Sequence, residues 1–288
     1  MSQDKVVITC ALTGVLANRA QCPWVPYTPV EIAEEAKRAY DAGASVVHIH
    51  ARDPESGGPS YSPDVYAAIA EETRKRCPII LNFSTGAIGV PAEQKIAPVI
   101  RVKPEIAALN MGSMNYAKYS EKRKEFVFDM VFENPFGEII HFLKAMNEVG
   151  SKPELECFDS GHTNSIGPLL DMGVLKPPLQ FSFILGVLGG IPATTDALSF
   201  QAKQVPTGST WEVIGISHIQ WRLIAAALSL GGNIRVGLED NFYVSPGVMA
   251  QSNGDLVAKA ARMSRDVGRE PATVDEARQI LSLKPRNS

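Results

Sequence analysis

The chain has 288 residues, of which 45% are hydrophobic and 20% charged, and its formal net charge is −3. This length suits one large domain, which we expect to span residues 1–288, and the interspersed charges exclude the basic stripe of a nucleic-acid-binding protein. The longest apolar stretch, Leu223–Leu230, is too short to span a bilayer. None of the four cysteines belongs to a C-x-x-C pair, and residues 1–5 do not have the pattern of a signal peptide. We therefore expect a cytoplasmic protein with free thiols and no membrane partner.

Short apolar runs, typical of strands, alternate with helical patterns along the whole chain. Several of the runs are almost continuously apolar, as in parallel strands that are covered on both faces. The eight expected strands are Val6–Leu12, Ser45–His50, Ile79–Phe83, Ile106–Asn110, Glu154–Phe158, Gln180–Ile184, Trp211–Ile214 and Asn233–Gly237. Eight strand–helix units in succession favour the α/β class and a closed (β/α)8 TIM barrel. The rival, an open doubly wound sheet, usually carries a G-x-G-x-x-G turn after its first strand, and Thr13–Leu16 contains none.

The predicted helices have recognisable ends. Thr28 and Pro29 start the first helix, and Glu31 completes a capping box with Thr28. Gly43 ends this helix in a left-handed conformation, and Ser62–Pro63 starts the second helix.

Two segments lie outside the repeating units. Met111–Glu133 is long and mixed in charge, and we expect a loop that covers the barrel mouth or contacts a neighbouring subunit. Residues 252–283 predict two extra C-terminal helices.

Two histidines close the second predicted strand. His48 and His50 are two residues apart, so they project from one face of the strand and Ile49 from the other. They stand at the C-terminal strand end, where TIM-barrel active sites are built, and two neutral imidazoles on one face form half of a zinc site. A lone strand histidine is usually a satisfied core or surface residue, but two polar rings inside a barrel need partners.

Acidic residues follow the eighth predicted strand. Glu239 as third ligand completes a His2Glu set with an open coordination position, the pattern of catalytic zinc. Asp240 is then free as a general base or an orienting group. The alternative is a solvated acidic pair at a strand end.

The fifth predicted strand carries two further carboxylates. Glu154 and Glu156 share one face, and a glutamate inside a barrel is costly unless it is paired. Arg235 is the candidate interior partner. The alternative is one exposed glutamate and one ion-paired glutamate.

Together these residues resemble the β-keto acid cleavage enzymes, a family of zinc TIM-barrel enzymes, over nearly the whole chain. The segments that carry the resemblance are Ile8–Gly14, Val47–Arg52, Ser84–Gly86, Leu109–Gly112, Pro153–Glu156, Leu185–Val187 and Asn233–Asn241.

The resemblance implies an enzyme that joins a β-keto acid and acetyl-CoA to give acetoacetate and a new acyl-CoA, and that works as a homotetramer. His48, His50 and Glu239 would hold zinc or another divalent ion, which the keto acid would chelate. Asp240 would take the proton from the carbon between the carbonyls, with Arg235 as its partner. The other implied site residues are the catalytic Ser84 and Glu156 and the substrate-facing Leu16, Thr85, Gly86 and Asn110.

Two departures from the family pattern bear on the substrate. Family members that cleave an amino-bearing substrate carry Glu where this chain has Leu16, so we expect a neutral or apolar substrate tail. Two other substrate tails stay open. A quaternary ammonium could make a cation–π contact with Trp24 or Tyr27, and an anionic tail could bind Arg19. Ala108 stands where some members carry Thr near the bound ligands.

Other functions compete with this interpretation. A metal-dependent TIM-barrel hydrolase would need further His ligands, and His162 is the nearest candidate. A metal-dependent aldolase would work without CoA, and a closed four-ligand zinc site would be structural. No Gly-rich loop marks a CoA site, so its residues are not identified; Arg101, Lys103 and Lys118 are basic candidates that could equally be solvated.

Overall fold

The computed structural model describes residues 4–284. Residues 1–3 and 285–288 lie outside this range, and with them part of the N-terminal segment used above for the signal-peptide expectation. Eight parallel strands close into a barrel in the spatial order β10-β11-β2-β3-β4-β5-β8-β9, which confirms the predicted TIM barrel. Their bounds are β2 Ile8–Ala11, β3 Val46–Ile49, β4 Ile80–Ser84, β5 Ile106–Asn110, β8 Lys152–Cys157, β9 Gln180–Leu185, β10 Thr210–Gly215 and β11 Asn233–Val236.

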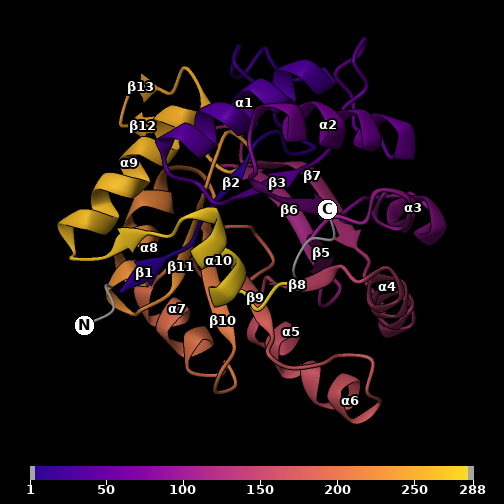
Figure 1. Ribbon diagram of the computed structural model, residues 1–288. Helices are drawn as coiled ribbons and strands as arrows, with labels where there is room; N and C mark the ends of the chain where they lie inside the picture. The colour runs from indigo at the N-terminus through magenta and orange to yellow at the C-terminus, as the bar shows by residue number, and fades with distance from the viewer. Residues whose placement is uncertain (1–3, 285–288) are drawn as a thin grey trace.

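Helices surround the barrel as a ring (Figure 1). They are α1 Pro29–Ala42, α2 Pro63–Arg76, α3 Ala92–Val102, α4 Phe136–Val149, α5 Ser160–Asn164, α6 Ile166–Asp171, α7 Thr195–Ala202, α8 Gln220–Ser229 with the short η1 Ser217–Ile219 before it, and α9 Asn253–Asp266. None of the helices between residues 4 and 284 has the length and hydrophobicity that crossing a bilayer would require.

The two C-terminal helices have different places. Helix α9 packs on α1 and on strands β2 and β11, so it completes the eighth strand–helix unit instead of lying outside it. Helix α10 (Val274–Ile280) alone is additional. The chain leads into it through β14 (Glu270–Pro271), which pairs with β1 (Lys5–Val6) outside the barrel.

The first helix ends as its sequence predicts. The Thr28 side chain accepts from the Glu31 backbone N–H, and the Glu31 side chain accepts from the Thr28 backbone N–H. Gly43 follows the helix with φ of 114°, a conformation that favours glycine. These ends fix where the chain leaves α1 for the strand that carries the two histidines.

The segment predicted as a loop is a β-hairpin. Strands β6 (Met114–Ser120) and β7 (Glu125–Phe132) pair antiparallel, with an irregularity between Lys118 and Tyr119. The hairpin follows β5, and Ala117 forms a bridge with Leu188 in the loop after β9. It therefore lies at the C-terminal end of the barrel, beside the mouth. A second small hairpin, β12 (Tyr243–Ser245) with β13 (Val248–Met249), follows β11.

The inward-facing residues change character along the barrel. At the N-terminal end the residues of β3, β4 and β5 are apolar (Val46, Ile80 and Ile106), and helix α10 closes this end with Ala277 and Leu281. Further along, the strands turn polar side chains inward, and the register aligns Ala11 with His48, and His48 with Asn82. The polar groups of neighbouring strands are thus brought to one end of the barrel.

Candidate active site

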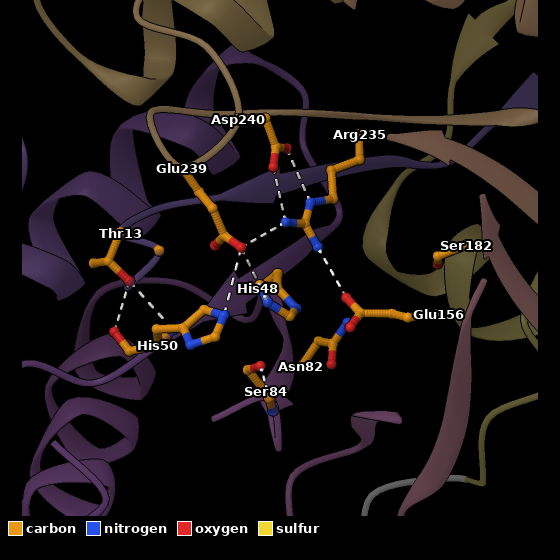
Figure 2. Close-up of polar contacts among 12 residues, drawn as sticks. Thr13, His48, His50, Asn82, Ser84, Glu156, Ser182, Arg235, Glu239 and Asp240 are labelled. Carbon is orange, nitrogen blue, oxygen red and sulfur yellow. Dashed lines mark hydrogen bonds and ion pairs between the residues drawn. The ribbon is translucent and has the colours of Figure 1, made fainter. Parts of the chain in front are cut away.

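The two histidines lie at the mouth end of β3 and face one carboxylate. The Nε2 atoms of His48 and His50 are 3.7 and 3.4 Å from the Glu239 Oε1 atom (Figure 2). His48 is fully buried, and the His50 side chain is about one-tenth exposed. Thr13 fixes the backbone of His50, because its hydroxyl donates to the His50 carbonyl (2.6 Å) and accepts from the His50 N–H (3.2 Å).

Two glycines allow Glu239 to reach these rings. Gly237 follows β11 with φ of 144°, and a Cβ at this position would stand 2.0 Å from the Ala11 carbonyl oxygen. Gly14 lies against the Glu239 side chain, and a Cβ there would stand 2.7 Å from Glu239 Cγ. The Glu239 N–H also donates to Ala11 O at 3.2 Å. The turn after β11 therefore directs Glu239 into the mouth, as the prediction requires.

Arg235 connects three carboxylates inside the barrel. Its guanidinium makes a two-bond pair with Asp240, with both distances 3.0 Å. It donates to Glu239 Oε1 at 2.8 Å and to Glu156 Oε1 at 3.5 Å. The predicted pairing of Arg235 with an interior glutamate is thus present, and the partner is Glu156. A single cation shared by two buried carboxylates and the partly buried Glu239 leaves the cluster short of positive charge.

The pKa values reflect this balance. Burial raises the pKa of Glu239, but Arg235 and the two imidazoles outweigh it and hold that pKa well below the usual range. Burial raises the pKa of Glu156 to about 7 and that of Asp240 to about 6, and in both cases Arg235 partly offsets the rise. Burial, then the nearby Arg235, lowers the pKa of His48 well below its usual value, so its ring stays neutral and offers a lone pair.

The residues fit a divalent cation. The two imidazoles and the Glu239 carboxylate form the predicted group, and their ligand atoms all lie within 4.8 Å of one another. His48 Nε2, which faces Glu239, and Glu239 Oε2 are buried without a hydrogen-bond partner. Orphaned buried groups of these types are what an ion would satisfy.

The other predicted site residues lie around this group, in three different situations. Ser84 and Asn110 end β4 and β5 at the mouth, and a Cβ on Gly86 would stand 3.2 to 3.9 Å from Asn110, Ser84 and His50. Thr85 instead donates its hydroxyl to Ala108 O at 2.6 Å, which ties β4 to β5. Leu16 lies in the loop after β2 and is 53% exposed.

Arg52 is a site-supporting residue that the sequence did not reveal. Its buried guanidinium donates to the carbonyls of Thr13, Gly14 and Ala17 at 2.5 to 3.0 Å, and to Gly57 O at 2.7 Å. It thereby holds the loop that carries Gly14 and Leu16 against the end of β3. Backbone carbonyls leave no signature in a sequence, so no pattern could have found this clamp.

A polar layer inside the barrel was also missed. Besides Glu154 it contains Thr9, Asn82, Gln180, Ser182 and Glu212, all buried and joined by hydrogen bonds. A signal existed, because Gln180 and Ser182, like Thr210 and Glu212, are polar residues two apart within predicted strands.

The remaining histidine and two of the three basic candidates lie elsewhere, whereas Lys118 is on β6 of the hairpin beside the mouth. His162 is in α5, and its Nδ1 accepts from the Phe158 N–H at 3.3 Å. It joins neither of the two groups of potential metal ligands found among residues 4–284, which are His48 with His50 and Glu239, and His48 with Glu154 and Glu156. The additional His ligands of a hydrolase are therefore not near the pair. Arg101 and Lys103 lie at the C-terminal end of α3, which leads into the start of β5 and so to the barrel end opposite the mouth.

Comparisons with known proteins decide the family. The family model for the beta-keto acid cleavage enzyme matches residues 5–283. The chain belongs to the β-keto acid cleavage enzyme family. Over 98% of this chain and 99% of the relative, it is 39% identical to a 3-keto-5-aminohexanoate cleavage enzyme of Fusobacterium nucleatum. It is 33% identical to a 3,5-dioxohexanoate:acetyl-CoA acetone transferase of Paraburkholderia graminis, over 98% and 97% of the two chains.

Solved structures agree on the fold. ObcA in a binary complex with oxaloacetate has a TM-score of 0.73 and 22% identity, and the match covers 91% of this chain and 68% of ObcA. At this identity the likeness shows the shared barrel alone. Membership of the β-keto acid cleavage family makes the chain an enzyme.

Proposed function

We propose that this enzyme cleaves a β-keto acid with acetyl-CoA, using zinc or another divalent ion held by His48, His50 and Glu239, and releases acetoacetate and an acyl-CoA. The observation that carries the proposal is the convergence of these three side chains beside the Arg235–Asp240 pair, in a member of this family. The names of several relatives describe acetyl-CoA-dependent transferases.

The residues divide the chemistry among them. When bound, the ion would act as a Lewis acid toward the keto and carboxylate oxygens of the substrate. Asp240 takes a proton from the carbon between the carbonyls, and the pKa of about 6 places its carboxylate in the working range of a base. Arg235 holds Asp240 through two bonds and so fixes which oxygens face the substrate.

The bond changes balance without another reactant. The carbon deprotonated by Asp240 attacks the acetyl carbonyl of acetyl-CoA, and the CoA thiolate leaves. The thiolate then attacks the original keto carbon, and the bond between that carbon and the deprotonated carbon breaks. An acyl-CoA forms, and the released carbanion of acetoacetate takes back the proton held by Asp240. We expect Ser84, Asn110 and Glu156, near the mouth ends of β4, β5 and β8, to hydrogen-bond the reacting oxygens, and Thr85, whose hydroxyl donates to Ala108 O, to support the mouth.

The loop after β2 supports a neutral or apolar substrate tail. Leu16 is exposed on this loop, two residues after the Gly14 that contacts Glu239. Arg19, the candidate for an anionic tail, is bound by both Glu31 carboxylate oxygens at 2.8 Å. The Tyr27 ring, a candidate for a quaternary ammonium, already has Arg19 over it at 4.2 Å and Arg52 at 5.3 Å. Trp24 is half exposed, so the quaternary ammonium alternative depends on this residue.

The experiment is product analysis after incubation with acetyl-CoA and four β-keto acids, whose tails are neutral, amino-bearing, quaternary ammonium and carboxylate. We expect acetoacetate and acyl-CoA, most rapidly from the neutral tail, and loss of turnover on chelation that Zn²⁺ restores. Leu16→Glu is expected to shift preference toward the amino-bearing acid, with Leu188→Glu, on the loop after β9, as control. Metal-dependent cleavage that proceeds without CoA would instead support the hydrolase or aldolase.

We also propose that the enzyme is a homo-oligomer, and the family resemblance implies a tetramer. The β6–β7 hairpin exposes the large apolar side chains Tyr119, Phe126, Val127 and Val131, an arrangement that favours contact with another copy. Light scattering of the purified enzyme tests it. A monomer at micromolar concentration would contradict it, and Phe126→Lys is expected to reduce association.

A further inference from the structure

Two buried carboxyl groups lie in the barrel interior outside the Arg235 cluster. Glu154 on β8 and Glu212 on β10 are each at most 3% exposed. Such positions in a TIM barrel are usually filled by branched apolar side chains, and a carboxylate there is costly without partners. Neither residue has a part in the proposed chemistry, so their presence needs a separate explanation.

The two carboxyls differ in how completely they are bonded. Glu212 uses both oxygens, accepting from Thr9 Oγ1 at 2.7 Å and from Ser182 Oγ at 3.1 Å. Glu154 uses only Oε2, which accepts from Asn82 Nδ2 at 2.6 Å and Gln180 Nε2 at 3.0 Å. Its Oε1 is buried without a hydrogen-bond partner. Glu154 therefore holds a fixed orientation and has an acceptor to spare.

The missing partner is on His48. Its Nε2 faces Glu239, and its Nδ1 is buried without a hydrogen-bond partner. One ring nitrogen of His48 and one carboxylate oxygen each of Glu154 and Glu156 lie within 4.8 Å of one another. In Figure 2 the His48 ring lies between Glu239 on one side and Asn82 and Glu156 on the other. Of these two carboxylates, Glu154 is the one with a buried oxygen that lacks a hydrogen-bond partner, so we assign it to His48.

We propose that Glu154 is a positioning residue for the metal ligand His48, with its carboxylate accepting the Nδ1–H of the ring directly or through one water. A metal-binding histidine almost always donates its second ring N–H to an acceptor, which fixes the tautomer and the ring orientation. With Nδ1 protonated, the Nε2 lone pair is directed to the ion beside Glu239. Asn82 and Gln180 hold Glu154 in turn. This inference rests on the metal site of the proposed function and adds a second layer to it.

The test compares Glu154→Gln with Glu212→Gln, the same change at an equally buried carboxyl of the same interior. The readouts are the Zn²⁺ dissociation constant, measured by competition with a chelator, and the visible spectrum of the Co²⁺-loaded protein. We expect Glu154→Gln to weaken Zn²⁺ binding by about 10- to 100-fold and to shift the Co²⁺ bands. Glu212→Gln is expected to leave the Zn²⁺ Kd within about twofold of the wild-type value, because that carboxyl meets no metal ligand.

Each outcome decides the matter. Wild-type Zn²⁺ affinity in Glu154→Gln, or equal losses in both variants, would overturn the proposal and leave Glu154 as one polar core residue among several. If Glu154→Gln does not fold, Glu154→Asp supplies the comparison, and an unchanged Kd there would be equally contrary. Failure of the wild-type protein to bind a divalent ion would instead defeat the proposed function. Wild-type binding and CoA-dependent cleavage, with an unaffected Glu154→Gln, would defeat this inference alone.

Discussion

On strands β3 and β4, the two ends of the barrel carry opposite kinds of side chain. On β3, Val46 packs with the apolar residues of α10 that close the N-terminal end of the barrel, called the plug below. His48, two residues further along the same face, meets Glu239 at the mouth. On β4, Ile80 at the plug gives way to Asn82 and then to Ser84. A TIM barrel thereby separates stability, at the N-terminal strand ends, from chemistry at the C-terminal ends. The separation implies that mutations at the two ends should alter different measured quantities.

The largest effect on turnover is expected at the mouth, from Asp240→Asn. Without the carboxylate base, acyl-CoA formation should fall by about 10² to 10⁴-fold. Asparagine keeps the shape and still offers Oδ1 to Arg235, so the fold should be retained, which circular dichroism checks. Glu121→Gln, in the exposed turn of the β6–β7 hairpin, is the control and should keep full activity. Turnover above one-tenth of wild type in Asp240→Asn would rule out Asp240 as the base.

Arg235→Met, although at the mouth, should reduce both stability and activity, because it removes the cation that Glu156, Glu239 and Asp240 share. We expect the metal-free protein to lose about 3–5 kcal/mol of unfolding free energy, besides its activity. Urea unfolding of the chelated protein measures this, with the exposed Arg101→Met as control. A loss below about 1 kcal/mol would mean that the carboxylates adapt by protonation or hydration rather than depending on the guanidinium.

At the plugged end, Ile80→Ala should affect stability alone. Ile80 is fully buried between Val46 and Ile106, and its truncation leaves a cavity that costs about 2–4 kcal/mol. The kcat/KM per folded molecule should stay at the wild-type value. Ile100→Ala, at a 46% exposed position, should change the unfolding free energy far less. A loss of kcat/KM in folded Ile80→Ala would show that the plug is coupled to the mouth.

The regular parts of the molecule were open to prediction from local patterns. The two-residue spacing of His48 and His50 sets their common face, and eight strand–helix units imply a mouth where they meet Glu239. The β6–β7 hairpin was not predicted, because β7 is apolar at most positions and the irregular pairing of the two strands hides the alternation of polar and apolar residues. The position of α9 in the eighth strand–helix unit was not predicted, because it depends on the packing of α9 on α1 and not on helical periodicity.

The candidate site was predictable in its ligand types and less so in its support. Glu239 could be placed only by assuming that the chain turns after β11, and the close approach of Gly237 to Ala11 is the physical basis of that turn. The clamp of Arg52 and the unpaired Oε1 of Glu154 depend on contacts between residues far apart in sequence, which no single-chain pattern encodes.

The smallest expected effect is a pH dependence at the plugged end. Lys152, the first residue of β8, donates to Leu281 O at 2.6 Å beyond α10, and burial lowers its pKa to about 8. An unfolded lysine titrates near 10.4, so between about pH 8 and 10.4 the unfolded chain binds more protons and the free energy of unfolding rises with pH. Below pH 8 both states are protonated, and the cost of burying the charge is fully present.

The measurement is urea unfolding of wild type and Lys152→Met at pH 7 and pH 9.5. Relative to the variant, wild type should gain about 1 kcal/mol between these pH values, a figure reduced for the partial exposure of the amine. The exposed Lys176→Met is the matched control and should give no such gain. Because the comparison is a difference of differences, titration elsewhere in the chain cancels. A wild-type advantage that does not grow with pH would mean that the Leu281 carbonyl or water stabilises the ammonium fully, and that charge burial costs nothing at this end of the barrel.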